Sequence, residues 1–186
     1  HNIGIVESGT GFLFGLVGYN FNSSLATLVI LIYMSILVLI CTIDIRNRLV
    51  PNKVVCPSTV LILLLFPLSL TAPEHNVWQI YIVGIQGGMM GFLVMLLLYL
   101  ILPGGIGAGD VKLGGLIGVA VGSPSIFATL AFAFIAGGVA ALLLLSLKFM
   151  SLKDKMPYAP YLAGSTIVIL LFGDNIPILY MALSKI

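Results

Sequence analysis

The stretch that decides the fold is residues 25–43, LATLVILIYMSILVLICTI, which contains no charged side chain. Asp44 follows it directly and opens the polar segment DIRNRLVPN, residues 44–52. The hydrocarbon core of a bilayer is about 30 Å thick and needs about 20 helical residues, at about 1.5 Å each. We therefore interpret residues 25–43 as a transmembrane helix with a carboxylate at its end.

The composition of the whole chain agrees with this interpretation. Of the 186 residues, 60% are apolar and only 8% are charged, comprising 8 Lys and Arg and 6 Asp and Glu. A soluble domain carries roughly 25% charged residues. Together with a mean hydropathy of +1.22, this excludes a disordered chain, a nucleic-acid-binding protein and a secreted disulfide scaffold. The sequence predicts an all-α polytopic membrane protein, with residues 1–186 forming one membrane-embedded domain.

Other apolar runs give a total of six to seven transmembrane helices. We predict them at 54–70, 78–102, 105–122, 126–147 and 156–172, with a short, glycine-rich span at 9–21. The run after Asp110 is too short to cross a bilayer alone, so we start this element at Gly105. Residues 175–186 are expected to lie in the membrane interface.

The basic residues predict an orientation, because Lys and Arg are retained on the cytoplasmic side. Alternating the spans places seven of the eight on one face: Arg46, Arg48, Lys53, Lys112, Lys148, Lys153 and Lys155. Only Lys185 falls on the other face. The connections after residues 43, 102 and 147 are therefore expected to be cytoplasmic.

Two of the four aspartates lie at membrane boundaries on this face. Asp44 ends its span, and Asp110 closes a glycine-rich turn, PGGIGAGD, residues 103–110. A carboxylate at a membrane boundary is expensive and indicates function by default; the alternative for Asp44 is an interfacial ion pair with Arg46 or Arg48. Two carboxylates in one site are what an aspartyl protease needs: the ionised one takes a proton from water and the protonated one polarises the scissile carbonyl.

The glycines before Asp110 suit the same interpretation. Gly104, Gly105, Gly107 and Gly109 leave the backbone without side chains where an extended substrate would lie, and they permit unusual turns. A merely flexible loop is the alternative. Cys41 and Cys56 form no C-x-x-C pair, so the sequence predicts neither a metal site nor a redox motif.

These residues resemble the signature segments of a known family. Asp44, Arg46 and Pro51–Asn52, followed by Gly107-Ala108-Gly109-Asp110 and Lys112, are similar to the two signatures of the prepilin peptidases, the type IV leader peptidases of the GxGD aspartyl protease class. A third segment, Met156 to Leu162 (MPYAPYL), is similar to the proline- and aromatic-bearing segment before the family's last span. The likeness covers nearly the whole chain.

The resemblance implies a function and a site. Asp44 and Asp110 would be the catalytic pair, with site-shaping or substrate-binding roles for Gly107, Gly109, Lys112, Pro51, Asn52, Pro157, Tyr158 and Pro160. The reaction would be cleavage, at the cytoplasmic face of the inner membrane, of the basic leader of type IV prepilin or pseudopilin precursors, usually after a glycine. These precursors and the lipid bilayer would be the partners, with no nucleic acid, no metal and no cofactor.

Several alternatives stay open. Many family members also methylate the new N-terminus with a preceding domain that carries paired C-x-x-C motifs; here such a domain is absent or lies before His1. Presenilin-like and signal-peptide-peptidase-like GxGD proteases carry Tyr-Asp and Pro-Ala-Leu segments, whereas Ile43 precedes Asp44 here. A small proton-coupled transporter would place its carboxylates near the middle of the membrane. The sequence leaves the oligomeric state open.

Overall fold

The structure, a computed structural model, describes residues 3–20, 24–47, 49–69, 77–102, 105–149 and 156–172. Within these residues the chain forms seven helices. They are α1 (Ile3–Asn20), α2 (Ser24–Asn47), α3 (Asn52–Ser69), α4 (Val77–Ile101), α5 (Ala108–Val121), α6 (Ser125–Ser146) and α7 (Ala159–Phe172). The predicted interfacial tail at 175–186 lies outside the described residues, as do Gly104, Arg48, Lys153, Lys155 and Lys185.

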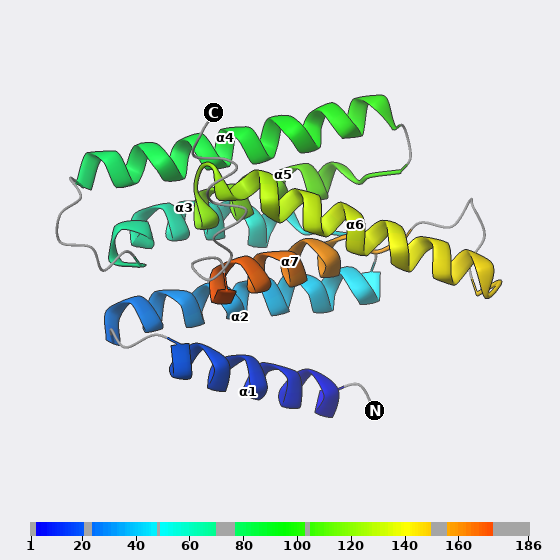
Figure 1. Ribbon diagram of the computed structural model, residues 1–186, viewed down its shortest axis with the longest axis horizontal. Helices are drawn as coiled ribbons and strands as arrows, with labels where there is room; N and C mark the ends of the chain where they lie inside the picture. Colours follow the sequence, from blue (N-terminus) through cyan, green and yellow to red (C-terminus); the bar gives the residue numbers. More distant parts are fainter. Residues whose placement is uncertain are drawn as a thin grey trace.

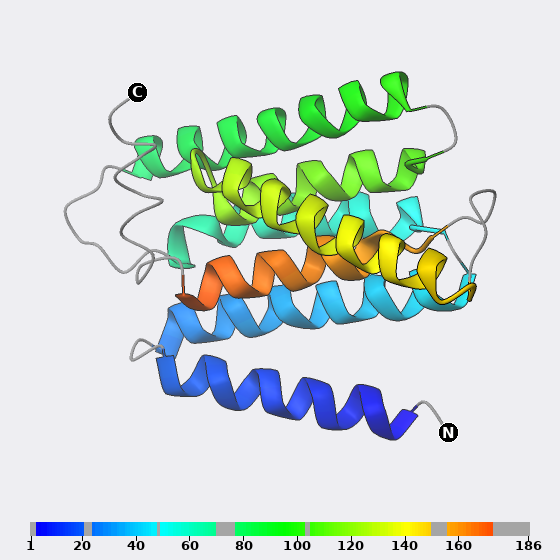
Figure 2. The ribbon, with the colours of Figure 1, turned by 45° about the vertical axis from the view of Figure 1, so that its right-hand side comes forward.

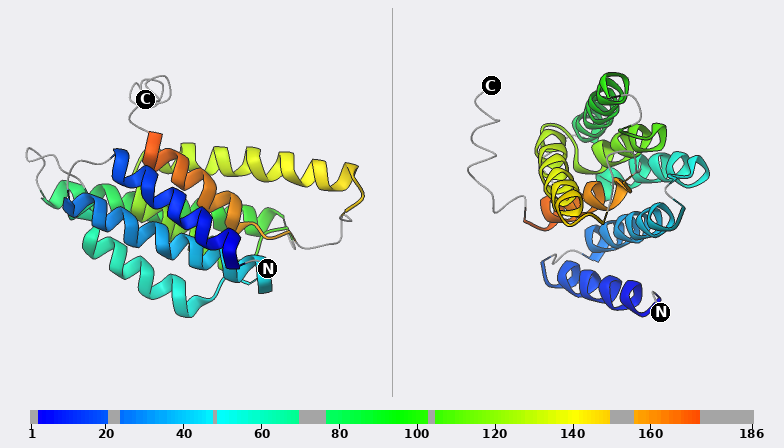
Figure 3. Two further views of the ribbon diagram at one scale, coloured as in Figure 1. Left: turned by 90° about the horizontal axis from the view of Figure 1, so that it is seen from below. Right: turned by 90° about the vertical axis from the view of Figure 1, so that its right-hand side faces the viewer.

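Successive helices run in opposite directions along one bundle (Figures 1 and 2). The last turns of α2, α4 and α6 and the first turns of α3, α5 and α7 therefore lie at one end, which we call the site end. Seen along the helices, α1 lies at the edge of the bundle beside α2 (Figure 3, right). This alternation is the arrangement that the sequence predicts for consecutive transmembrane spans.

The helices are apolar on the outside as well as inside. Thr27–Asn47, Val77–Ile101 and Ser125–Ser146 are long and apolar enough to cross a membrane, and Asn52–Leu65 and Ala159–Phe172 are shorter apolar helices. Large side chains such as Leu100, Ile135 and Leu142 are more than 60% exposed on the bundle surface. An exterior of this kind suits lipid and not water. The protein is an all-helical polytopic membrane protein.

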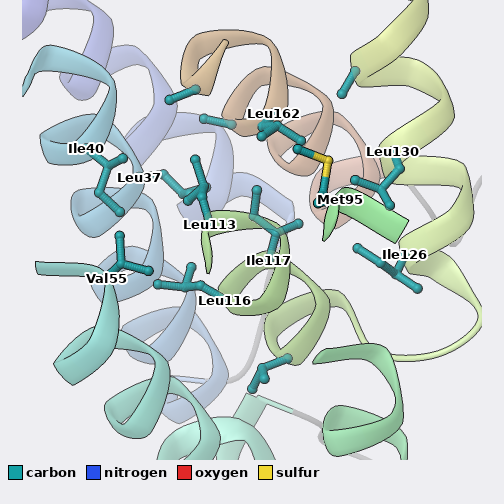
Figure 4. Packing of buried hydrophobic residues seen from close by; sticks show 14 of the residues in the cluster. Leu37, Ile40, Val55, Met95, Leu113, Leu116, Ile117, Ile126, Leu130 and Leu162 are labelled. Atoms are coloured by element: carbon teal, nitrogen blue, oxygen red, sulfur yellow. The ribbon is translucent and has the colours of Figure 1, made fainter. Parts of the chain in front are cut away.

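Helix α5 lies in the middle of the bundle. Its side chains Leu113, Leu116 and Ile117 are fully buried and contact residues of the neighbouring helices (Figure 4). Among the partners in this core are Leu37, Ile40, Val55, Met95, Ile126, Leu130 and Leu162, which come from α2, α3, α4, α6 and α7. Because protein surrounds α5, its polar first turn is kept out of the lipid.

Glycines let α4 and α5 pack unusually closely. A Cβ at Gly87 would collide with the backbone of Gly118 and Gly122, and one at Gly91 would collide with the backbone of Gly114. Small residues at such positions allow the backbones of two membrane helices to approach. The contact fixes α5 against the long helix α4, and with it the residues at the start of α5.

We expect Gly118→Ala to destabilise the protein and Gly115→Ala to leave it almost unchanged. The new methyl group at position 118 would meet the backbone of Gly87, which cannot move aside, whereas at position 115 its nearest neighbours are at 3.5–3.8 Å. Overpacking of this kind costs about 1–3 kcal/mol. Thermal unfolding of the two purified variants in the same detergent measures the difference, and equal midpoints would contradict the close α4–α5 contact.

The bounds of α3, α4 and α6 agree with the predicted spans to within two residues, and those of the other four helices differ. Helix α1 begins at Ile3, six residues before the predicted start of its span at Gly9. Helix α2 continues through Asn47, so Asp44 lies inside its last turn and not beyond its end. Helix α5 begins at Ala108 and not at Gly105, since Gly107 is extended (φ −82°, ψ 147°). Helix α7 begins at Ala159, with Pro160 in its first turn, where proline is tolerated because the N–H it lacks would have no helical partner.

Candidate active site

Asp44 is buried at the site end of α2 and is bound by the start of α7. Its side chain is 4% exposed, and its Oδ2 accepts a hydrogen bond of 3.1 Å from the backbone N–H of Ala159. Ala159 is the first residue of α7, and N–H groups in a first turn have no partner within the helix. They carry a partial positive charge that favours a carboxylate. Asp44 does not pair with Arg46, the alternative considered from the sequence. Arg46 is exposed and lies two residues further along the helix, and side chains at that spacing do not face each other.

Asp110 is buried in the first turn of α5. It is 8% exposed, and its Oδ2 accepts a hydrogen bond of 3.1 Å from the N–H of Gly107, whose carbonyl in turn accepts from the Asp110 N–H at 3.0 Å. The GxGD segment thus caps its own helix. The second oxygen, Oδ1, is buried and has no hydrogen-bond partner among the described residues.

The structure brings the two aspartates together at the site end. Asp44 lies close enough for its negative charge to act on Asp110. Helix α7 packs against both α2 and α5, so it holds the two helices that carry the carboxylates. Both side chains lie within a turn of a helix end, which differs from the mid-membrane position that a proton-coupled transporter would use.

Two contacts join the segment after Asp44 to the segment around Asp110. Gly109 lies against Val50, so that a Cβ on Gly109 would be 2.7 Å from the Val50 Cβ and 3.0 Å from its carbonyl oxygen. Lys112 Nζ donates a hydrogen bond of 2.9 Å to Oδ1 of Asn52. The two predicted signature segments therefore contact each other. The missing side chain at Gly109 makes room for Val50, whereas the sequence had suggested that it leaves the backbone open to a substrate.

The remaining predicted residues frame these contacts. The carbonyl oxygen of Pro51 accepts hydrogen bonds from the N–H groups of Val54 and Val55, which starts α3 beneath the site. Pro157 precedes α7 and is half-buried, and Pro160 lies in its first turn. Gly107 donates its N–H to Asp110 and is exposed. All ten predicted residues thus lie around the site end of α2, α3, α5 and α7.

Tyr158 extends toward this site from the segment before α7. Its ring stacks on Phe134 of α6 (centroids 5.9 Å apart, 27° between planes), and its hydroxyl is buried without a hydrogen-bond partner among the described residues. Burial, and after it the charge of Asp110, raises the pKa of the Tyr158 phenol above its ordinary value. The phenol therefore stays protonated and can donate a hydrogen bond.

Sequence reasoning missed the backbone of Ala159 as a site element. Its N–H binds Asp44, and its carbonyl oxygen accepts the Cys41 thiol at 3.8 Å, so two side chains of α2 hold this one residue. It also missed Val50, the partner of Gly109. An alanine that acts through its backbone and a valine in a loop leave no signal in a sequence, because neither side chain carries chemistry.

An apolar groove lies on another face of α5. It has a volume of about 280 Å³ and includes Thr59 of α3, Gly88 and Phe92 of α4, and Gly115 and Val119 of α5. None of its lining residues is titratable. Acid–base chemistry needs titratable groups, so the candidate active site is the carboxylate pair and not this groove.

Known proteins resemble the chain over most of its length. Residues 31–142, which include both aspartates, match the model of the type IV leader peptidase family, Peptidase_A24. The chain is 26% identical over 175 residues to a prepilin leader peptidase/N-methyltransferase of Bacillus subtilis, covering 94% of this chain and 68% of that protein. It is 28% identical to one of Pseudomonas putida (92% and 59%) and 27% identical to one of Stutzerimonas stutzeri (98% and 62%).

The chain therefore spans about 60–70% of the length of these relatives. No solved structure is significantly similar to it. The matched family region includes α5 and most of α2, the two helices whose ends carry the buried carboxylates. On this evidence the chain belongs to the type IV leader peptidase family.

Proposed function

We propose that this protein is a membrane aspartyl endopeptidase that removes the leader peptide from type IV prepilin-like precursors, with Asp44 and Asp110 as its catalytic pair. The observation that carries the proposal is the burial of these two carboxylates at one end of the bundle, close enough to interact. Family membership and the printed names of the relatives support the substrate class. Our proposal concerns the peptidase step and does not extend to methyl transfer.

In the proposed mechanism the pair shares one proton, because close carboxylates do not both ionise easily. The ionised carboxylate takes a proton from a water molecule as the water oxygen attacks the scissile carbonyl carbon. The protonated one gives its proton to the carbonyl oxygen. As the C–N bond of the neutral tetrahedral intermediate breaks, the carboxyl that took the water proton gives it to the leaving nitrogen. The other carboxylate takes the proton of one hydroxyl as that oxygen becomes the carbonyl of the new acid, so the pair again shares one proton.

We further propose that the site end faces the cytoplasm at the inner membrane. Arg46, Lys53, Lys112 and Lys148 are the described basic residues near this end, in or beside the connections that the positive-inside rule assigns to the cytoplasm. A basic leader held on this face would meet the two carboxylates without crossing the bilayer.

The direct test is cleavage of a prepilin-like precursor by the purified chain in detergent or proteoliposomes. Mass spectrometry of the products should show one cut, directly after the glycine that ends the leader. A precursor with that glycine replaced by valine is the matched control and should stay intact. Absence of cleavage, or a cut inside the hydrophobic segment of the precursor, would contradict the proposal.

A further inference from the structure

Two buried polar atoms at the candidate site lack a hydrogen-bond partner among the described residues: Oδ1 of Asp110 and the hydroxyl of Tyr158. Burying a polar group without a partner is unfavourable, and such groups call for an explanation. The charge of Asp110 acts on the Tyr158 phenol, so the two groups share one neighbourhood. Neither satisfies the other, which leaves both available to a third polar group.

Packing on several sides fixes the Tyr158 ring. Phe134 stacks on it, and the ring of Tyr161 is tilted against it with centroids 6.4 Å apart. Gly137 of α6 makes room for the ring edge beside the hydroxyl, since a Cβ there would lie 3.0 Å from Cε2 of Tyr158. A ring held in this way gives its hydroxyl a defined position.

The backbone of the same residue is tied to the other aspartate. The Tyr158 carbonyl accepts hydrogen bonds from the N–H groups of Tyr161 and Leu162 at 3.1 and 3.3 Å, which fixes it on the first turn of α7. The next residue, Ala159, donates its N–H to Asp44. Tyr158 is thus placed relative to Asp44 through the backbone and relative to Asp110 through its side chain.

We propose that Tyr158 is a third catalytic residue, whose hydroxyl donates a hydrogen bond to the oxygen of the scissile carbonyl while Asp110 and Asp44 act on the carbonyl and the water. This rests on the proposed peptidase function. In the transition state the carbonyl oxygen gains negative charge as the water oxygen bonds to the carbonyl carbon. A donor fixed in advance and shielded from water stabilises that charge more than it stabilises the substrate. Tyr158 keeps its own proton throughout.

The test compares Tyr158→Phe with Tyr161→Phe in the same 186-residue chain, with a prepilin-like precursor as substrate. The first variant removes one hydroxyl and keeps the stacked ring, and the second removes a hydroxyl from the neighbouring ring. We expect kcat of Tyr158→Phe to fall on the order of 100-fold, the effect of losing one such donor. KM and the thermal midpoint should stay close to those of the wild type, and Tyr161→Phe should cleave normally.

The outcomes separate this inference from the proposed function. If the wild type cleaves and Tyr158→Phe has the same kcat per folded molecule, Tyr158 has no catalytic role and the peptidase proposal stands. A loss of activity explained by less folded protein, or shared by Tyr161→Phe, shows a structural role and overturns the inference. If the wild type itself leaves the precursor intact, the proposed function fails and the inference fails with it.

Discussion

Asp44→Asn and Asp110→Asn should each abolish leader cleavage, while both variant proteins still accumulate in the membrane. An amide neither takes a proton from water nor gives one to a carbonyl oxygen, so the general acid–base contribution of about 10²- to 10⁴-fold is lost. The fold should survive because the Asn carbonyl oxygen can still accept the N–H of Ala159 or of Gly107. Each substitution thus removes the acid–base group and keeps the hydrogen bond from the backbone N–H.

Glu7→Gln provides the matched control for these two variants. Glu7 is exposed on α1, which lies at the edge of the bundle and carries none of the candidate site residues, so its loss of charge should leave cleavage unchanged. Conversion of a co-expressed precursor is followed on gels, with immunoblots of the membrane fraction to compare protein amounts. Processing retained at the wild-type rate in either Asp variant would remove that residue from the catalytic pair.

Gly109→Ala is expected to lower cleavage by about 100-fold, although the substitution adds only one methyl group. The new Cβ would lie 2.7 Å from the Cβ and 3.0 Å from the carbonyl oxygen of Val50, so the start of α5 must move away from the segment that follows α2. Asp110 is the next residue in the chain and moves with it. A misplacement of about 1 Å in a catalytic geometry costs about 10²-fold.

Two further variants isolate the cause of this effect. Gly105→Ala adds the same methyl group in the same turn, but its nearest neighbours are 3.4–3.5 Å away, and we expect near-normal cleavage. Val50→Gly in the Gly109→Ala background removes the nearer clash and should restore part of the activity. Initial cleavage rates at equal protein amounts measure both effects. Equal rates for Gly109→Ala and Gly105→Ala would rule out the contact with Val50 as the reason for the glycine.

The sequence predicted α2 and α5 to different extents. The charge-free run before Asp44 predicted a helix, and α2 contains it, but the run alone could not show that the helix continues to Asn47 through a polar turn. For α5 the apolar run correctly predicted a helix, but the predicted start at Gly105 is three residues before the observed start at Ala108. Gly105–Gly107 is apolar enough to join a span by composition, whereas the cap formed by Asp110 fixes the first turn at Ala108.

The sequence by itself determined the class of protein, the succession of helices and the two carboxylates of interest. A bilayer imposes length and apolarity on each span, and it makes a charge at a boundary rare enough to stand out. The placement of the residues could not be determined in the same way. The tertiary structure decided that Asp44 meets the first N–H of α7, 115 residues away, that Lys112 meets Asn52 and that Gly109 meets Val50. Two of these contacts use backbone atoms, which every residue type carries, and all join distant segments. Only the folded packing of the helices specifies them.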